Sequence, residues 1–375
     1  MTALLIAAAS GRALAASARR GGYVPLVADF FGDRDMAEVA EDHVRLESGL
    51  ARGMTREELF PALDRLAAGR QPVGIVCGTG FEDRPELLKE IARRWPLFGN
   101  TPDAVARVKE PIELAELCRS AGIPHPETTR APPGDPAGWL AKRQGGAGGR
   151  HVVPAANRDC SKPSQYYQRW AEGVAISALI LSDGDRTAML GFSEQWTSPS
   201  RRQPFRYGGA VRPAAIGADM ESALSAATER LFSAIRLVGL NSADFLVDGE
   251  TFRLLEINPR PGATMDLFEP PDGSLLAMHV AACRGRLPEA VPRLEGAVAA
   301  AIVYAEADIE SVPDLEWPAW TADRPSAGSV IKTDEPICTV LATDANATAA
   351  RILVHTRTAA IRAAMMRGCH EYAAG

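Results

Sequence analysis

Three polar side chains lie within two apolar segments near the middle of the chain, where they could hold a divalent cation. The segments cover residues 241–248 and 251–258, and the side chains are Asp244, Glu256 and Asn258. Carboxylate and amide oxygens suit Mg²⁺, whose coordination phosphate oxygens then complete. Carboxylates in apolar strands need partners or a metal, because burying an unpaired charge is costly. The alternative is an ordinary hairpin with polar residues at its edge.

The turn between the segments decides whether these side chains share one face. Asp248-Gly249 is a hairpin signal, and side chains alternate between the two faces of a strand. A two-residue turn there pairs Asp244 with Arg253, and Glu256 then faces the other way. A three-residue or bulged loop pairs Asp244 with Leu254 and aligns all three candidate ligands. The metal hypothesis therefore requires the odd loop.

Arg260 follows directly after the second segment, at the end of the motif Asn258-Pro259-Arg260. Its guanidinium is a fixed fork of donors, which can hold a carboxylate or an acyl phosphate. We therefore predict a catalytic role for Arg260, next to the metal site.

A glycine-rich loop lies between two β-rich stretches in residues 139–153. Four of its five positions are glycines, namely Gly145, Gly146, Gly148 and Gly149. Glycines let backbone N–H groups approach phosphate oxygens closely. Lys142, on the incoming strand, can add a positive charge to the same phosphates. The loop is neither a Walker A loop nor a GxGxxG fingerprint, and a flexible hairpin loop is the alternative.

Two other segments are weaker candidates for the same site. Residues 168–173 read as a strand that leads into a glycine turn, and extended backbone there could present N–H and C=O groups to an adenine edge. A plain strand and turn is the alternative. Residues 200–209 hold three arginines and two glycines, and such a loop could close over an acidic substrate and exclude water. Arg206 and Tyr207 are its candidate substrate contacts, with a solvated loop as the equal alternative.

The first hundred residues must position further polar groups. Short apolar runs alternate there with helical stretches, which indicates an open parallel α/β sheet. The runs are residues 4–9, 24–28 and 73–77. Ligands of such sheets lie outside the carboxyl ends of the strands. Arg12, Asp33 and Glu82 are thus placed to face a ligand, and Arg12 and Glu82 are our candidate substrate contacts. The alternative is that each only starts a helix or forms a turn.

The chain changes character twice, so we expect three parts. Residues 1–105 are the α/β domain, residues 106–283 mix strands and helices, and residues 284–375 form a small β-rich region with a final helix. In the last part we expect strands over 297–305 and 337–342 and a helix over 347–366. The fold class is therefore α/β followed by α+β.

Bulk properties exclude some classes of protein. The net charge of −6 over 375 residues leaves no excess positive charge for a nucleic acid. No apolar stretch reaches the roughly 18 residues of a membrane span. The six scattered cysteines indicate ordinary thiols in a reducing, cytoplasmic compartment. A secretory signal is the rival interpretation of the N-terminus, but the basic n-region is missing and Arg12 interrupts the apolar run. We favour a strand followed by a helix.

Taken together, the motifs resemble the ATP-grasp superfamily, in the family's order and over most of the chain. The resemblance implies a pre-ATP-grasp domain, then the ATP-grasp domain. It also implies that Lys109 and Lys142 are the nucleotide-binding lysines and that Asp244, Glu256 and Asn258 are magnesium ligands. The segment implied to bind adenine includes Gln168, Trp170, Ala171 and Glu172. Many members place a ribose-binding glutamate where this chain has Ala175, so ribose contacts must come from elsewhere, such as Glu172.

The resemblance implies an ATP- and Mg²⁺-dependent ligase that joins a small carboxylate to an amine through an acyl phosphate. The chain is most similar to the carbamoyl-phosphate-synthase-like branch, which includes cofactor-biosynthesis ligases such as tyramine–glutamate ligase. A kinase or a carboxylating enzyme on the same scaffold is one alternative, and a non-catalytic ATP-binding sensor is another. A nicotinamide oxidoreductase rests only on the N-terminal α/β pattern and lacks its glycine fingerprint. A homodimer is the default expectation for a soluble enzyme.

Overall fold

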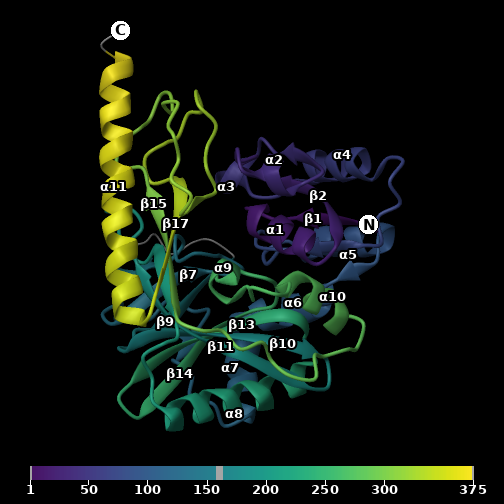
Figure 1. Cartoon of the computed structure of the whole chain (residues 1–375). Helices are drawn as coiled ribbons and strands as arrows, with labels where there is room; N and C mark the ends of the chain where they lie inside the picture. The colour runs from purple at the N-terminus through teal and green to yellow at the C-terminus, as the bar shows by residue number, and fades with distance from the viewer. Residues whose placement is uncertain (1, 158–163, 374–375) are drawn as a thin grey trace.

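The computed structural model describes residues 2–157 and 164–373. An N-terminal α/β domain lies beside a C-terminal β region, and both rest on a central domain built on a large antiparallel sheet (Figure 1). This arrangement confirms the predicted fold class. Among the helices of the described ranges, none is both long and apolar enough to cross a membrane.

The N-terminal domain is a five-stranded parallel sheet in the order β3-β2-β1-β4-β5. Its elements are β1 (Thr2–Ala7), α1 (Arg12–Arg20), β2 (Tyr23–Asp29), α2 (Met36–Val39), β3 (Asp42–Arg45), α3 (Gly49–Arg52), α4 (Arg56–Ala67), β4 (Ile75–Cys77), α5 (Pro85–Arg94) and β5 (Leu97–Phe98). The predicted strand and helix at the N-terminus are β1 and α1. The strand order reverses between β1 and β4, and ligands of open α/β sheets bind at such a point. The loops after these strands meet there, where the amide of Ala9 donates to the carbonyl of Thr79 at 2.7 Å.

Two helices lead from this domain into the central one. They are α6 (Pro102–Lys109) and α7 (Pro111–Ser120), and α6 runs across the domain boundary that we expect at residue 105. A small antiparallel sheet follows, in the order β6-β9-β7-β8. Its strands are β6 (Thr128–Thr129), β7 (Trp139–Arg143), β8 (Val153–Pro154) and β9 (Gln165–Arg169), with a 3-10 turn, η1 (Ala155–Asn157), after β8.

The large sheet has the order β14-β13-β10-β11-β12-β15-β17-β16. Its central strands and the associated helices are β10 (Val174–Asp183), β11 (Thr187–Thr197), β12 (Tyr207–Arg212), α8 (Ala218–Ile235), β13 (Val238–Asp248), β14 (Thr251–Asn258), α9 (Met265–Phe268) and α10 (Leu275–Ala282). One face packs on α8 through Leu224, Leu231 and Phe232. The opposite face shares a core with the N-terminal domain that includes Leu4 and Leu276.

The C-terminal region continues the large sheet, because β12 pairs with β15. Its elements are β15 (Ala297–Tyr304), β16 (Thr321–Ala322), β17 (Pro336–Asp344) and α11 (Ala347–Ala373). The predicted strands and final helix are present. The long α11 packs along β15 and β17 (Figure 1) through Ala350, Val354 and Ile361. The boundary we expect at residue 284 therefore divides the chain without dividing the sheet.

His279 joins three parts of this fold and gives it a pH dependence. Its Nδ1 accepts from the amide of Leu240 at 2.8 Å, and its Nε2 donates to the carbonyl of Phe98 at 3.0 Å. The ring is fully buried, and burial lowers its pKa to about 4. A second ring proton would also point at the Leu240 amide, so the folded state keeps the ring neutral.

We therefore expect the free energy of unfolding to fall as the pH drops from about 6.5 to about 4. The unfolded chain binds the proton in this range and the folded chain does not. This difference lowers the free energy of unfolding by up to about 3 kcal/mol. Urea unfolding at several pH values measures this slope. In His279→Gln the slope should be shallower, although the protein should be less stable at pH 7. An unchanged slope in the variant would assign the pH dependence to other groups.

Candidate functional site

The β13–β14 hairpin brings the candidate metal ligands to one face through a bulge. Its turn is Gly249-Glu250, because Asp248 pairs with Thr251. Regular pairing from that turn would place Asp244 opposite Leu255, with Glu256 on the other face. The register shifts beyond Phe245, and Asp244 then pairs directly with Glu256. Both pairings considered for Asp244 from the sequence are therefore wrong, but the required alignment is present, produced within the strand and not in the loop.

The three candidate ligands contact one another. The amide nitrogen of Asn258 lies 2.9 Å from Oδ2 of Asp244 and 3.5 Å from Oε1 of Glu256. Ser177, on β10, donates to Oδ1 of Asp244 at 2.6 Å. Two carboxylates and an amide are a partial ligand set for Mg²⁺, which phosphate oxygens would complete. In the described part of the chain, no group of three His, Cys, Asp or Glu side chains could hold a metal by itself. A cation here also requires Asn258 to turn its amide oxygen inward.

Burial and charge separate the two carboxylates. Burial raises the pKa of Asp244 to about 7, and the negative charge of Glu256 acts in the same direction. Burial alone would also raise the pKa of Glu256, but Lys109 and Lys142 outweigh it and lower that pKa to about 2. Glu256 is thus the permanent anion of the pair, and a cation between them would favour ionisation of both.

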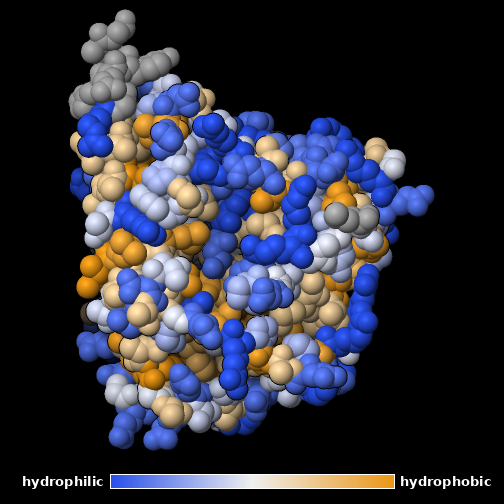
Figure 2. Space-filling view, viewed as in Figure 1, coloured by the Kyte–Doolittle hydropathy of each residue, from blue (hydrophilic) through white to orange (hydrophobic). Residues whose placement is uncertain are grey.

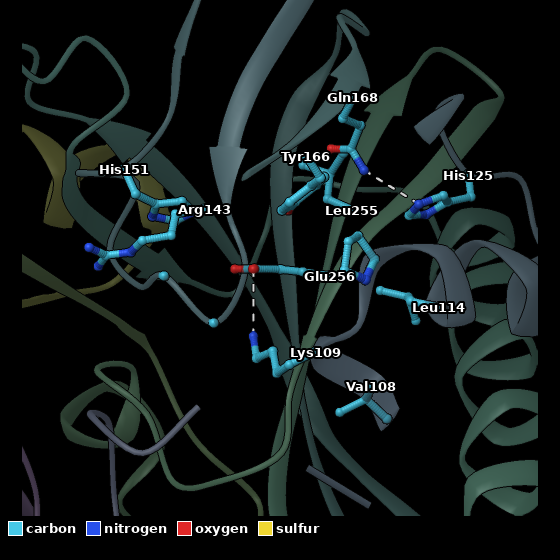
Figure 3. Close-up of a pocket in the computed structure, with 13 residues that line it drawn as sticks. Val108, Lys109, Leu114, His125, Arg143, His151, Tyr166, Gln168, Leu255 and Glu256 are labelled. Carbon is cyan, nitrogen blue, oxygen red and sulfur yellow. Dashed lines mark hydrogen bonds and ion pairs between the residues drawn. The ribbon is translucent and has the colours of Figure 1, made fainter. Parts of the chain in front are cut away.

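Two lysines from different elements converge on Glu256. Lys109, at the end of α6, is buried and donates to Oδ1 of Asn258 at 2.8 Å, and its Nζ lies 3.6 Å from Oε2 of Glu256. Figure 3 shows the Glu256 carboxylate pointing at this ammonium. Lys142, on β7, donates to Oε1 of Gln168 at 2.6 Å. Burial lowers the pKa of Lys142, Lys109 adds to the effect, and Glu256 and Asp244 oppose it. These contacts leave the ammonium groups beside a pocket and close to the carboxylates.

The pocket is a cleft between these elements that opens to solvent. Of the predicted site residues, Lys109, Gly145, Gly146, Gln168 and Glu256 line it. Residues that line it and that we did not predict are Val108, Pro111, Leu114, His125, Arg143, His151, Tyr166 and Leu255 (Figure 3). Strand alternation could have identified Tyr166, which lies two residues before Gln168 and pairs with Lys142. Leu114 and Leu255 give an apolar wall, on which a flat ring can pack.

The glycine-rich loop packs tightly against the arginine-rich segment 200–209, which leads into β12 and which we call the basic loop. The carbonyl of Gly148 accepts from the amide of Tyr207 at 2.9 Å. A Cβ on Gly149, whose φ is +68°, would lie 1.9 Å from the carbonyl oxygen of Phe205. The glycines are needed for these close approaches as well as for any phosphate contact. The Phe205 ring in turn lies 5.6 Å from that of Trp170, just after β9.

Comparisons with known proteins identify the central part of the chain. A model of the ATP-grasp domain matches residues 110–264. Residues 110–264 form an ATP-grasp domain. This segment includes Lys142 and all three candidate metal ligands, and Lys109 directly precedes it.

Relatives extend the likeness beyond this domain. The carbamoyl phosphate synthase large chain of Deinococcus radiodurans is 23% identical over 230 residues, which cover 55% of this chain and 22% of that protein. The chain thus matches about a fifth of the length of this curated relative. Among solved structures, the biotin carboxylase domain of Hydrogenobacter thermophilus 2-oxoglutarate carboxylase has a TM-score of 0.71 at 13% identity, with 92% of this chain and 87% of that chain covered. N5-carboxyaminoimidazole ribonucleotide synthetase has a TM-score of 0.69 at 16% identity, with coverages of 95% and 96%.

The remaining nucleotide candidates lie at the edge of the ATP-grasp domain's pocket. Trp170, Ala171 and Glu172 follow β9 directly and do not line the pocket, and Trp170 is half exposed. On β9, Gln168 is the last residue that lines the pocket. Its amide nitrogen lies 3.4 Å from Nε2 of His125. That residues 170–172 bind adenine stays a prediction. Such binding would use their backbone N–H and C=O groups.

The loop after β14 packs against the N-terminal sheet at the point between β1 and β4 where the strand order reverses. Arg260 donates from Nε to Oε1 of the buried Glu82 at 2.7 Å, and Glu82 also accepts from the amides of Gly80 and Phe81. Arg12 forms ion pairs with Asp266 and Asp323. The predicted substrate contacts Arg12 and Glu82 therefore hold this loop in place.

Arg206 is also engaged within the protein. It donates to Oδ1 of Asp334 at 3.0 Å, and its guanidinium lies 3.7 Å from the centre of the Tyr304 ring. It is buried and anchors the basic loop to the C-terminal region. Tyr207 faces the ATP-grasp site instead: burial raises the pKa of its hydroxyl, and the charges of Asp244 and Asp266 add to the effect.

Proposed function

We propose that the chain is an ATP- and Mg²⁺-dependent ligase that joins a carboxylate to an amine through an acyl phosphate. The convergence of Asp244, Glu256 and Asn258 opposite Lys109 and Lys142 carries this proposal, because it occurs at the pocket of an ATP-grasp domain. The relatives support it: the 2-oxoglutarate carboxylase structure contains MgADP and bicarbonate, and the ribonucleotide synthetase structure contains ADP.

In the proposed complex, the adenine packs on the apolar wall of Leu114 and Leu255, and the phosphates reach the glycine-rich loop. Lys109 and Lys142 offset phosphate charge, and Asp244, Glu256 and Asn258 would hold Mg²⁺. The metal supplies Lewis-acid stabilisation of charge on the transferred phosphoryl group. The protein's part is to hold the reacting groups in line and to place fixed positive charge where negative charge develops.

The carboxylate substrate is placed beside Arg260, whose Nε is taken by Glu82 while the two Nη groups lie toward Asn258 and Pro261. A carboxylate oxygen attacks the γ-phosphorus, and ADP leaves. The amine nitrogen then attacks the acyl carbon, phosphate leaves with the C–O bond electrons, and the amine loses one proton. Each step uses positioning and electrostatics, so the enzyme needs no covalent nucleophile.

A screen for ADP release with paired substrates tests the proposal. With Mg·ATP present, we expect ADP release to require both a carboxylate and an amine, and phosphate and the amide to form in equal amounts. Single-substrate reactions are the controls. ADP release with a carboxylate or bicarbonate alone would favour the kinase or carboxylating alternative. Stabilisation by Mg·ATP without turnover over the whole panel would favour a sensor.

A further inference from the structure

Carboxylates gather where the N-terminal domain meets the C-terminal region. Asp33 and Asp35 follow β2, Asp266 lies in α9, and Asp323 follows β16. We call these four residues the acidic cluster. In Figure 1, α9 lies between α1 and the strands of the C-terminal region, and Figure 2 shows hydrophilic side chains concentrated between the two lobes. The proposed function assigns no role to this cluster.

Two arginines neutralise only part of its charge. Arg12 donates to both oxygens of Asp266, at 3.0 and 2.5 Å, and its Nε donates to Oδ1 of Asp323 at 3.0 Å. Arg324 Nε lies 3.7 Å from Oδ2 of Asp35, and the same arginine also pairs with Glu38 outside the cluster. The two guanidiniums thus pair with Asp266, Asp323 and Asp35, and no ion pair among the described residues includes Asp33.

Asp33 is the member of the cluster that lacks a partner. It is 6% exposed, and its Oδ2 has no hydrogen-bond partner among the described residues. Burial raises its pKa to about 9, the charges of Asp323, Asp29 and Asp35 act in the same direction, and Arg12 opposes them. A buried carboxyl oxygen without a donor is unfavourable and requires an explanation. A cationic donor at this position would satisfy the oxygen and offset the repulsion.

The geometry favours an ammonium group over a metal ion. Within the described ranges, no three acidic, His or Cys side chains are arranged to hold a metal. An ammonium group has three N–H donors, which can reach separate carboxylates as charge-assisted hydrogen bonds. The side chains of Asp266 and Asp323 remain 18% and 22% exposed, so a ligand can approach the cluster from their side.

The cluster also lies on the substrate side of the ATP-grasp site. Asp266 belongs to the segment that follows Arg260, and Arg12 follows the loop at the point between β1 and β4 where the strand order reverses. The Tyr207 hydroxyl is close enough to both Asp244 and Asp266 for the two carboxylates to raise its pKa, after the larger effect of burial. Tyr207 therefore lies near both the acidic cluster and the proposed metal ligands.

We propose that the acidic cluster binds an ammonium group of the amine substrate, separate from the nitrogen that attacks the acyl carbon, with Asp33 as its direct partner. This inference rests on the proposed ligase function and adds a chemical class, because it requires a basic aliphatic amine that is protonated at neutral pH. Neutral aromatic amines and amides would lack the charge that the cluster recognises.

Binding to the full chain tests this inference without requiring turnover. We expect n-butylamine and 1,4-diaminobutane to raise the Tm of the wild-type protein, whereas the neutral 1-butanol should not. In Asp33→Asn the affinity for both amines should fall about 10- to 100-fold, which is the effect of losing one charge-assisted hydrogen bond. Asn is close to Asp in shape, so the variant should fold.

Asp64→Asn is the matched control, because Asp64 lies on α4 of the same domain, is 59% exposed and pairs with Arg94. It should bind the amines as the wild type does. Absence of stabilisation by either amine, equal stabilisation by 1-butanol, or an undiminished response in Asp33→Asn would overturn the inference. If the amines bind through Asp33 but never stimulate ADP release, the ligase proposal fails and the ammonium site stands.

Discussion

Glu256→Gln is expected to lower kcat for ADP release by about 10³-fold or more. The substitution keeps the shape of the side chain and removes the negative charge that faces Lys109 at 3.6 Å. Without that charge, Asp244 is the remaining carboxylate beside Asn258, and a single carboxylate is a poor site for Mg²⁺. The loss should appear mainly in kcat, because the metal acts on the phosphoryl group during transfer.

The matched control is Glu250→Gln in the turn of the same hairpin. Glu250 is exposed and pairs with neither the lysines nor Asp244 in the described structure. This variant should retain wild-type turnover, and both proteins should melt at similar temperatures. Full ADP release by Glu256→Gln would remove the metal assignment and the ligase proposal with it.

The parts of the fold that are visible in the sequence are those that are buried on all sides. The central strands β1 and β4 have residues of near-zero exposure, so they read as apolar runs between helices. β3, by contrast, is the half-buried edge segment Asp-His-Val-Arg, and β5 has two residues. Neither carries enough apolar pattern to be recognised, and each forms because a neighbouring strand is already in place.

The site shows the same division between local and distant causes. Residue types identified Glu256 and its partners, but the bulge that aligns them has no local signal. The extension before β6 contacts the hairpin there: the amide of Leu254 donates to the carbonyl of Pro124, and the carbonyl of Leu254 lies 2.7 Å from Nδ1 of His125. These contacts engage Leu254 from outside the hairpin at the point where the register shifts. Likewise, Arg12 meets partners 254 and 311 residues away, which no local pattern reveals.

Arg260 is the residue whose replacement should separate carboxylate recognition from nucleotide binding. Its Nε is fixed by Glu82 at 2.7 Å, and the side chain is 13% exposed. A guanidinium held in this way presents its two Nη groups in one plane, which matches the two oxygens of a carboxylate. Lysine retains the charge but cannot both pair with Glu82 and form two parallel hydrogen bonds. Arg260→Lys should therefore lower kcat/KM for the carboxylate by about 10²-fold and leave KM for ATP nearly unchanged.

The matched control is Arg253→Lys, which makes the same change on β14. Arg253 does not line the nucleotide pocket and takes no part in the contact between Glu82 and Arg260. Steady-state kinetics with each substrate varied in turn should show wild-type constants for this control. If Arg260→Lys instead raised KM for ATP and left the carboxylate constants intact, Arg260 would bind the nucleotide phosphates. The carboxylate would then have to be held elsewhere. Because Glu82 keeps a charged partner in the lysine variant, a buried unpaired carboxylate cannot account for the loss, and the change in kinetics reports the shape of the fork.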